Sequence, residues 1–257
     1  MRTAKILITR LFSGIVVLTT LTCHTALTAQ TTLPNKMRFL EFSYGFQWPM
    51  ADMQERFGAN NNINLAFQSA WMDSKLLAGA ELLYFFGNTV KEDVVASLRS
   101  FDGHIVGIDG TPGEVRLKER GFYTGISLAK VFAIGKSDRL TGIRFQVGGG
   151  LLQHKIRVQD DFNNVVPLDN KYLNGYDRLT NGPAVKVALG FQYQHPQNNA
   201  HFYILGDWIG GFTKSRRDFD YATGGYLDGN RFDALIGVRA AYIVTISSKG
   251  KSKVRYY

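Results

Sequence analysis

The sequence is poor in the residues that build thiol enzymes and disulfide scaffolds. It holds one cysteine, Cys23, and six prolines among its 257 residues. Cys23 lies in an N-terminal segment that we expect to be removed, which leaves no thiol nucleophile, thiolate metal site or disulfide. Nor does the rest of the chain contain an apolar run of about 20 residues, the length that a transmembrane helix needs. These absences exclude thiol chemistry and helical membrane spans.

Residues 1–29 have the pattern of a secretory signal peptide. A basic start precedes an apolar run at Leu11–Leu21, and small residues lead to an expected cleavage site after Ala29, with Ala26 as the alternative. We expect the remaining residues, 30–257, to form one exported domain. The exported chain would then be soluble in the periplasm, secreted, or inserted in an outer membrane.

The segment Arg38–Trp48 alternates large apolar side chains with small or polar ones. A period of two is that of a β-strand, with the two kinds of side chain on opposite faces. The same alternation recurs along the chain, which also contains 27 glycines. The segments predicted as strands are Arg38–Trp48, Asn62–Trp71, Leu76–Phe86, Gly121–Ile134, Thr141–Leu151, Gly182–Gln194, Ala200–Phe212 and Phe232–Ile246.

The connections between these strands are alternately long and short. Outer-membrane barrels have an even number of strands, long extracellular loops and short periplasmic turns. We therefore predict an all-β fold, an eight-stranded antiparallel transmembrane β-barrel. The long connections are Met50–Asn61, Asn88–Arg120, Gln153–Asn181 and Thr213–Arg231, and the short ones are Met72–Lys75, Gly135–Arg139 and His195–Asn199.

Two features are expected within the longest connection. Val90, Val94, Val95 and Leu98 have helical spacing, which predicts a short amphipathic helix around Lys91–Arg99. The glycine-rich segment Gly103–Gly113 then predicts turns or a small hairpin.

Charged residues within the predicted strands fall mostly on the face opposite the large apolar residues. In an eight-stranded barrel that face lines a lumen just wide enough for side chains to fill. Buried charges there must pair, because an isolated ion costs several kcal/mol. The predicted lumen network contains three acids and three bases: Glu41, Glu81, Arg144, Lys186, Asp207 and Arg239.

No catalytic, cofactor or metal site is predicted. The histidines after residue 29 have no neighbour at the spacing of metal ligands, and the acidic loop residues lack the order of a calcium loop. Small barrels include lipid-modifying enzymes that use a histidine, a serine and a carboxylate. His154 with Glu119 or Ser127 could only be forced into that pattern, and we favour the reading of His154 as a loop histidine at a strand end.

Basic residues are frequent in the long connections, in keeping with a formal net charge of +9. Solvated loop charges are one reading. The other is contact with phosphates of surface lipopolysaccharide, to which arginine and lysine donate charge-assisted hydrogen bonds. Nucleic acid is a poor partner for an exported barrel. The candidate lipopolysaccharide contacts are Arg116, Lys118, Lys155, Arg157, Lys214, Arg216 and Arg217.

In strand number, loop alternation and charged lumen, the chain resembles the porin-like, OmpA/OmpX-like class of small outer-membrane barrels, which has many members in Bacteroidota. Gly175–Gly182 (GYDRLTNG) and Leu151–Val158 (LLQHKIRV) look like signatures of such a family. The resemblance implies no catalytic residues, and some barrels of this class in that phylum are accessory components of protein secretion.

We therefore expect an outer-membrane protein that is not an enzyme, needs no cofactor, and acts as a structural or accessory component of an envelope complex. Its long outer loops would contact another envelope protein, while outer-membrane lipid and lipopolysaccharide surround the barrel. The alternatives are a narrow pore for small solutes and an enzyme that modifies lipid A.

Overall fold

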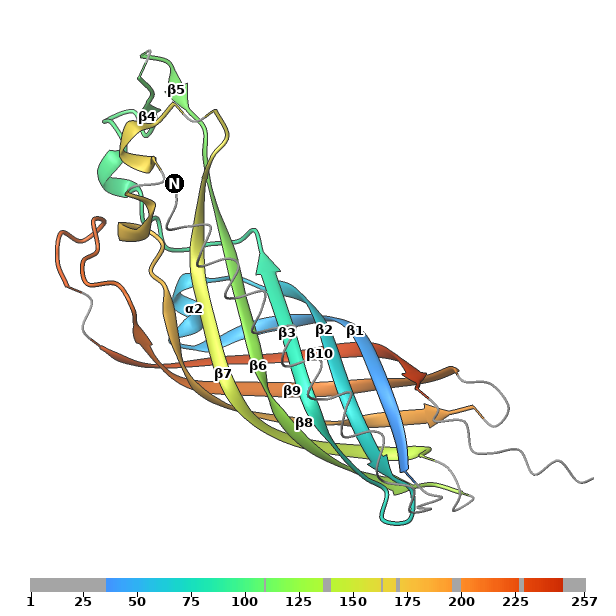
Figure 1. Cartoon of the computed structure of the whole chain (residues 1–257). Coiled ribbons are helices and arrows are strands. Elements are labelled where there is room, and N and C mark those ends of the chain that lie inside the picture. Colours follow the sequence, from blue (N-terminus) through green and yellow to red (C-terminus); the bar gives the residue numbers. More distant parts are fainter. Residues whose placement is uncertain are drawn as a thin grey trace, which may run out of the picture. The chain divides into compact units, whose positions relative to one another are not determined.

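In the computed structural model, eight strands form a closed barrel in which each strand is antiparallel to both neighbours (Figure 1). Each barrel strand pairs with the next barrel strand along the chain. The first, β1, also pairs with the last, β10, and this closes the ring. The structure describes residues 36–108, 110–135, 140–162, 164–169, 172–195, 200–226 and 229–246. The predicted signal peptide lies outside the described residues.

The observed strands confirm the predicted eight-stranded antiparallel barrel. Most are longer than expected by one to three residues at an end, and the first continues past Trp48 through Pro49. Two predicted bounds are wrong by more: the strand expected to begin at Gly121 begins at Val115, and the strand expected to end at Leu151 ends at Asp160. The barrel strands are β1 (Lys36–Ala51), β2 (Asn60–Trp71), β3 (Leu76–Gly87), β6 (Val115–Ala133), β7 (Gly142–Asp160), β8 (Thr180–Gln194), β9 (Ala200–Ser215) and β10 (Asn230–Thr245).

Alternation along the strands separates an apolar outer surface from a largely polar interior. On β1, for example, Phe42 and Trp48 are exposed while Glu41 and Gln47 are buried. Water-soluble monomers rarely expose apolar patches larger than a few hundred Å². Every strand contributes to the outer surface with exposed apolar side chains such as Phe42, Phe67, Leu82, Ile126, Phe145, Leu189, Ile204 and Ile236.

The two ends of the barrel differ in their connections. We call the end that holds the short connections, such as the turn between β2 and β3, the short-turn end, and the opposite end the long-loop end. At the long-loop end β6 and β7 rise past the other strands as a two-stranded ribbon (Figure 1). Pairing of β3 with β6 stops at Glu119, and pairing of β8 with β7 stops at His154. Beyond these residues β6 and β7 remain paired with each other, and Ile156 N–H also donates to the backbone oxygen of Asp177.

Within the long loops, one local prediction is wrong and one is confirmed. The segment expected to form an amphipathic helix contains only a short 3₁₀ turn at Ala96–Leu98. Val94 and Val95 are nevertheless fully buried against the barrel interior, so tertiary contact and not a helical face accounts for their apolar character. The glycine-rich segment forms the small hairpin of β4 (Ile105–Val106) and β5 (Pro112–Gly113). A four-residue helix, α2 (Met53–Arg56), follows β1 and was not predicted.

The interior contains two apolar clusters. One lies toward the long-loop end and includes Met53 and Phe57 from the first loop together with Leu83 and Tyr123 from the strands. The other lies toward the short-turn end and includes Phe39, Leu77, Leu140, Tyr203 and Ile243. Charged and amide side chains occupy the part of the barrel between these clusters.

Candidate functional site

The middle of the lumen is crossed by buried ion pairs. Arg144 on β7 contacts both carboxylate oxygens of Glu41 on β1, at 2.8 and 3.2 Å. Lys186 on β8 lies 2.5 Å from Glu81 on β3. In each case the two strands are not neighbours in the ring, so the pairs reach across the lumen and not along its wall.

The remaining predicted lumen residues lie in the same layer. Arg239 on β10 is 3.7 Å from Glu81, and Gln47 donates a 3.4 Å hydrogen bond to Asp207 on β9. Arg144 also donates to the side-chain oxygens of Gln146 and Gln192. All six residues expected in the lumen network are thus inside the barrel and buried. Together with the apolar clusters above and below them, their side chains fill the section of the barrel that a solute would have to cross.

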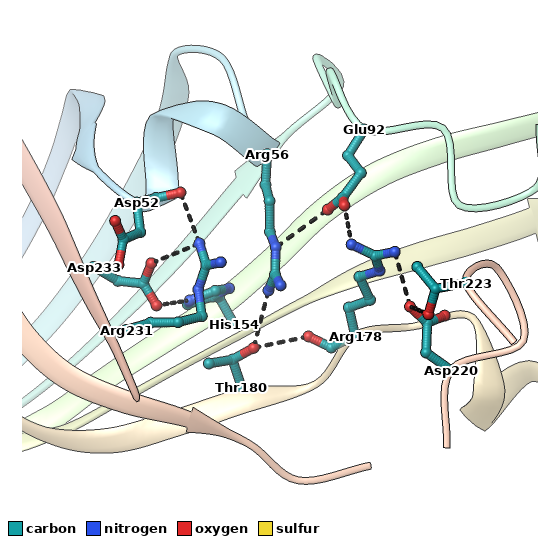
Figure 2. Close-up of polar contacts among 10 residues, drawn as sticks. All are labelled: Asp52, Arg56, Glu92, His154, Arg178, Thr180, Asp220, Thr223, Arg231 and Asp233. Atoms are coloured by element: carbon teal, nitrogen blue, oxygen red, sulfur yellow. Dashed lines mark hydrogen bonds and ion pairs between the residues drawn. The ribbon is translucent and has the colours of Figure 1, made fainter. Parts of the chain in front are cut away.

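A second polar network closes the long-loop end (Figure 2). Arg56, in α2, lies 3.1 Å from Glu92 in the second long loop and donates a 3.2 Å hydrogen bond to Thr180. Glu92 also pairs with Arg178 from the third long loop, and Arg178 reaches Asp220 in the fourth at 2.8 Å. One chain of contacts therefore connects all four long loops.

The charge of Arg56 is maintained in this network. Burial lowers the pKa of Arg56 to about 10, and the positive charges of Arg231 and Arg178 act in the same direction. A pKa near 10 still leaves the guanidinium protonated at neutral pH. Glu92 therefore neutralises a guanidinium group that is protonated and buried beneath the loops.

Beneath α2, the carboxylate of Asp233 organises a buried cluster (Figure 2). It contacts the His154 ring at 2.8 Å, accepts a hydrogen bond from Thr213, and lies 3.2 Å from Arg231. Arg231 also donates to the backbone oxygen of Asp52 at 2.7 Å. The cluster fixes the start of the first loop to the beginning of β10.

The expectation that His154 is a loop histidine is wrong, because β7 continues beyond it and its side chain is fully buried. Its hydrogen-bond partner is Asp233, not Glu119 or Ser127. Glu119 accepts from Asn60, and Ser127 accepts from Gln68. The arrangement considered for a lipid-modifying enzyme is therefore not the one that the side chains form.

The candidate lipopolysaccharide contacts fall into two groups, and the first consists of arginines that are paired with acids of the chain. Arg116 is close to two carboxylates, Glu114 and Asp161, at 2.5 and 3.0 Å. Arg217 lies 2.6 Å from Asp177, and hydrogen bonding to that carboxylate raises the pKa of the arginine. These arginines already have partners of opposite charge.

The other five candidates are on the outward side. Arg216 donates to the side-chain oxygen of Asn181 on β8, and Lys214 on β9 stands opposite the same Asn181. Lys118, Lys155 and Arg157 lie together on the β6–β7 ribbon. They are joined there by Arg120, which was not among the residues predicted.

A cavity of about 890 Å³ lies beside this ribbon. Arg120, Lys155 and Arg157 line it together with apolar side chains that include Phe122 and Val166. Among the residues that the structure describes there is no group of three or more His, Cys, Asp or Glu side chains placed to hold a metal ion. Within the same residues, no helix has the length and apolar character to span a bilayer.

Comparison with known proteins gives likenesses of fold only. No family model matches the chain, and no curated protein matches it. Among solved structures, Neisserial surface protein A has a TM-score of 0.42 and 9% identity, over 80% of this chain and 96% of that one. The outer membrane protein OprG from Pseudomonas aeruginosa has a TM-score of 0.35 and 13% identity, over 81% and 95%. The N-terminal β-barrel domain of Pseudomonas aeruginosa OprF has 0.32 and 13%, over 80% and 97%.

At these scores the likenesses carry no argument about activity, and the class of the protein is set by its own geometry. Its strands form a closed ring, its outer surface is apolar over every strand, and its interior holds paired charges. In hydrocarbon every backbone polar group must be paired within the protein, and a closed barrel satisfies this requirement with strands. The protein is a transmembrane β-barrel.

Proposed function

We propose that the protein resides in an outer membrane and acts without catalysis, as a closed barrel that presents its long loops to another envelope protein. The observation that carries the proposal is the combination of a filled lumen with loops that are cross-connected yet expose apolar side chains. Because the lumen is filled, the long loops are the part of the protein that is available to bind a partner.

The filled lumen supports a role other than conduction. A solute would have to pass the apolar cluster around Phe57, the Glu41–Arg144 layer and the apolar cluster around Phe39. Eight-stranded barrels have interiors that side chains can fill, whereas the aqueous channels of porins require 16 or more strands. A narrow pore remains the second candidate, and its test is ion conductance in a planar bilayer. We expect none, and steady conductance would favour the pore.

The loops have features of a binding surface. Their apolar side chains are exposed although the loop segments that bear them are held by the network around Arg56 and Arg178. Binding to loops that are already ordered costs less conformational entropy than binding to mobile ones. The exposed apolar side chains of the loops include Phe101, Ile108, Phe162, Val166 and Tyr226.

The proposal extends, on the family resemblance alone, to an accessory role in a protein-secretion complex. Loops on the outer face of the membrane would meet either a translocated protein or another subunit of the complex. A protein partner also accounts for aromatic side chains gathered in one loop, where Phe219 contacts both Tyr221 and Tyr226.

The test is quantitative cross-linking in intact cells, followed by purification from detergent-solubilised outer membranes and mass spectrometry. We expect one envelope protein to be enriched with the wild type and lost with the variant Phe162→Ser/Val166→Ser. The matched control is Ile134→Ser/Phe132→Ser, which removes exposed apolar side chains near the short-turn end and should retain the partner. A barrel that is always recovered alone would overturn the proposal.

A further inference from the structure

The outward face of the β6–β7 ribbon carries four basic side chains in two directly opposed pairs. Lys118 stands opposite Arg157, and Arg120 stands opposite Lys155. Residues opposed in an antiparallel pair have Cβ atoms about 4.5–5.5 Å apart, and like charges at such positions destabilise the sheet. We call these four residues the cation ladder.

The protein supplies the cation ladder with little negative charge. Lys155 is 3.6 Å from Asp177, a carboxylate that Arg217 already contacts at 2.6 Å. Lys118 donates to the uncharged side chain of Gln159, and Arg120 donates to backbone oxygens. Arg157, the strand partner of Lys118, has no side-chain hydrogen bond and no ion pair with any described residue. Among the described residues, Asp177 is the one carboxylate that forms an ion pair with a ladder cation, although Asp160 and Asp169 also line the neighbouring cavity.

The next position along the same ribbon shows what the ladder lacks. Arg116 is two residues before Lys118 on β6 and contacts the carboxylates of Glu114 and Asp161. Arg116 is therefore neutralised by carboxylates of the chain itself, in contrast to the four residues of the cation ladder. The unneutralised charge of the cation ladder points to an anion from outside the chain.

The cavity and the apolar surface beside the cation ladder indicate what kind of anion would fit there. Three of its side chains, those of Arg120, Lys155 and Arg157, line the cavity of about 890 Å³. The apolar outer surface begins immediately below, because Phe122 follows Arg120 by two residues and Leu151 precedes Lys155 by four on the outward faces of their strands. A ligand that fits has an anionic head at the height of the ladder and apolar chains beneath it.

We propose that the cation ladder binds the phosphorylated sugar headgroup of an outer-leaflet glycolipid. Its phosphates would accept charge-assisted hydrogen bonds from the four basic side chains, and its acyl chains would lie against Phe122 and Leu151. Arginine and lysine are suited to phosphate, arginine through paired N–H donors and lysine as a point charge. The proposal rests on the outer-membrane location proposed above and assigns the lipid contacts to one face of the barrel.

The experiment measures lipid binding to the full mature protein, extracted from membranes, by native mass spectrometry. The probes are diphosphoryl lipid A, monophosphoryl lipid A and phosphatidylglycerol. The test variant is Arg120→Gln/Arg157→Gln, which removes one cation from each opposed pair. The matched control is Arg99→Gln/Arg116→Gln, which removes the same charge from two exposed arginines that are paired with acids of the chain.

For the wild type and the control we expect diphosphoryl lipid A to bind more tightly than the other two lipids. The test variant should lose affinity for it by about tenfold or more, the effect of removing charge-assisted hydrogen bonds. Equal losses in the two variants, or equal binding of phosphatidylglycerol by the wild type, would overturn the assignment to a glycolipid. So would competition by millimolar inorganic phosphate, which would identify free phosphate as the ligand.

The partner assay separates this inference from the proposed function. Lipid binding is measured on the isolated barrel, so it does not depend on whether a protein partner exists. If Arg120→Gln/Arg157→Gln kept its lipid affinity but lost the cross-linked partner, the cation ladder would be a contact for an acidic protein, and the lipid assignment would be wrong. Folding of each variant is checked by its heat-dependent migration in gel electrophoresis.

Discussion

Glu41 on β1 and Arg144 on β7 form an ion pair between opposite walls of the lumen, because their strands stand four places apart in a ring of eight. Both side chains are essentially inaccessible to solvent, at 1% and 0% exposure. A pair in this position connects opposite walls of the barrel, which neighbouring-strand hydrogen bonds do not. It thereby fixes the cross-section of the lumen as well as its charge.

The first prediction concerns the cost of breaking this pair. Glu41→Gln leaves the charge of Arg144 buried without a counter-ion, so we expect the free energy of unfolding to fall by about 3–5 kcal/mol. Glu41→Gln/Arg144→Met removes both charges and should recover about half of that loss or more. Urea titrations of the barrel in lipid vesicles measure both values. Equal stability of the single variant and the wild type would show that the pair is not coupled to folding.

The second prediction tests which solvent surrounds the barrel. Ile126 lies midway along the outward apolar stretch of β6 and is 73% exposed. An arginine at the middle of a bilayer costs about 2–4 kcal/mol, and one near the interface about 0–1 kcal/mol. Ile126→Arg should therefore destabilise the inserted barrel much more than Ile134→Arg at the short-turn end. Equal effects of the two substitutions in vesicles would argue against a membrane around this face.

Much of the fold follows from the sequence because a period of two is maintained in every strand. The strongly alternating strand around Phe42 was located almost to its ends, and the alternation of long and short connections gave the strand number. The failures occur where tertiary contacts override the local pattern. Val94 and Val95 belong to a set of apolar residues with helical spacing. In the structure they are buried in the apolar cluster at the long-loop end, and a single 3₁₀ turn forms beside them.

The sites depended on information that a single sequence does not contain. Each lumen residue could be placed on the inner face by alternation, but its partner across the barrel depends on the register of strands that are not neighbours. The cation ladder is a similar case. The alternating segments around Lys118 and Arg157 were visible, whereas their direct opposition depends on how far β7 continues past Leu151. His154 was misplaced for the same reason.

The third prediction concerns the connection between the long loops. Glu92 contacts both Arg56 and Arg178, so Glu92→Gln leaves two buried guanidinium groups without their shared carboxylate. We expect a local loss of about 1.5–3 kcal/mol, the range for hydrogen bonds to charged groups. Amide hydrogen exchange should accelerate in all four long loops together. Glu55→Gln, in the neighbouring exposed helix position, is the control and should leave exchange unchanged.

A change confined to the second loop would contradict the third prediction, since it would mean that Glu92 does not couple the loops. In that case the exposed apolar side chains would have to be ordered by their own loops. The partner assay with Phe162→Ser/Val166→Ser would then report on the third loop alone.

The last prediction concerns the buried carboxylate of Asp233, which receives contacts from His154, Thr213 and Arg231. Asp233→Asn keeps the size of the side chain but removes the charge that Arg231 faces and replaces one acceptor oxygen with a donor. At a fully buried position this leaves donors unsatisfied, and we expect a loss of about 2–4 kcal/mol in the free energy of unfolding. Asp218→Asn makes the same change in an exposed loop segment and should be neutral within about 0.5 kcal/mol. If the two variants unfolded at the same urea concentration, Asp233 would not be the residue that fixes the first loop to β10.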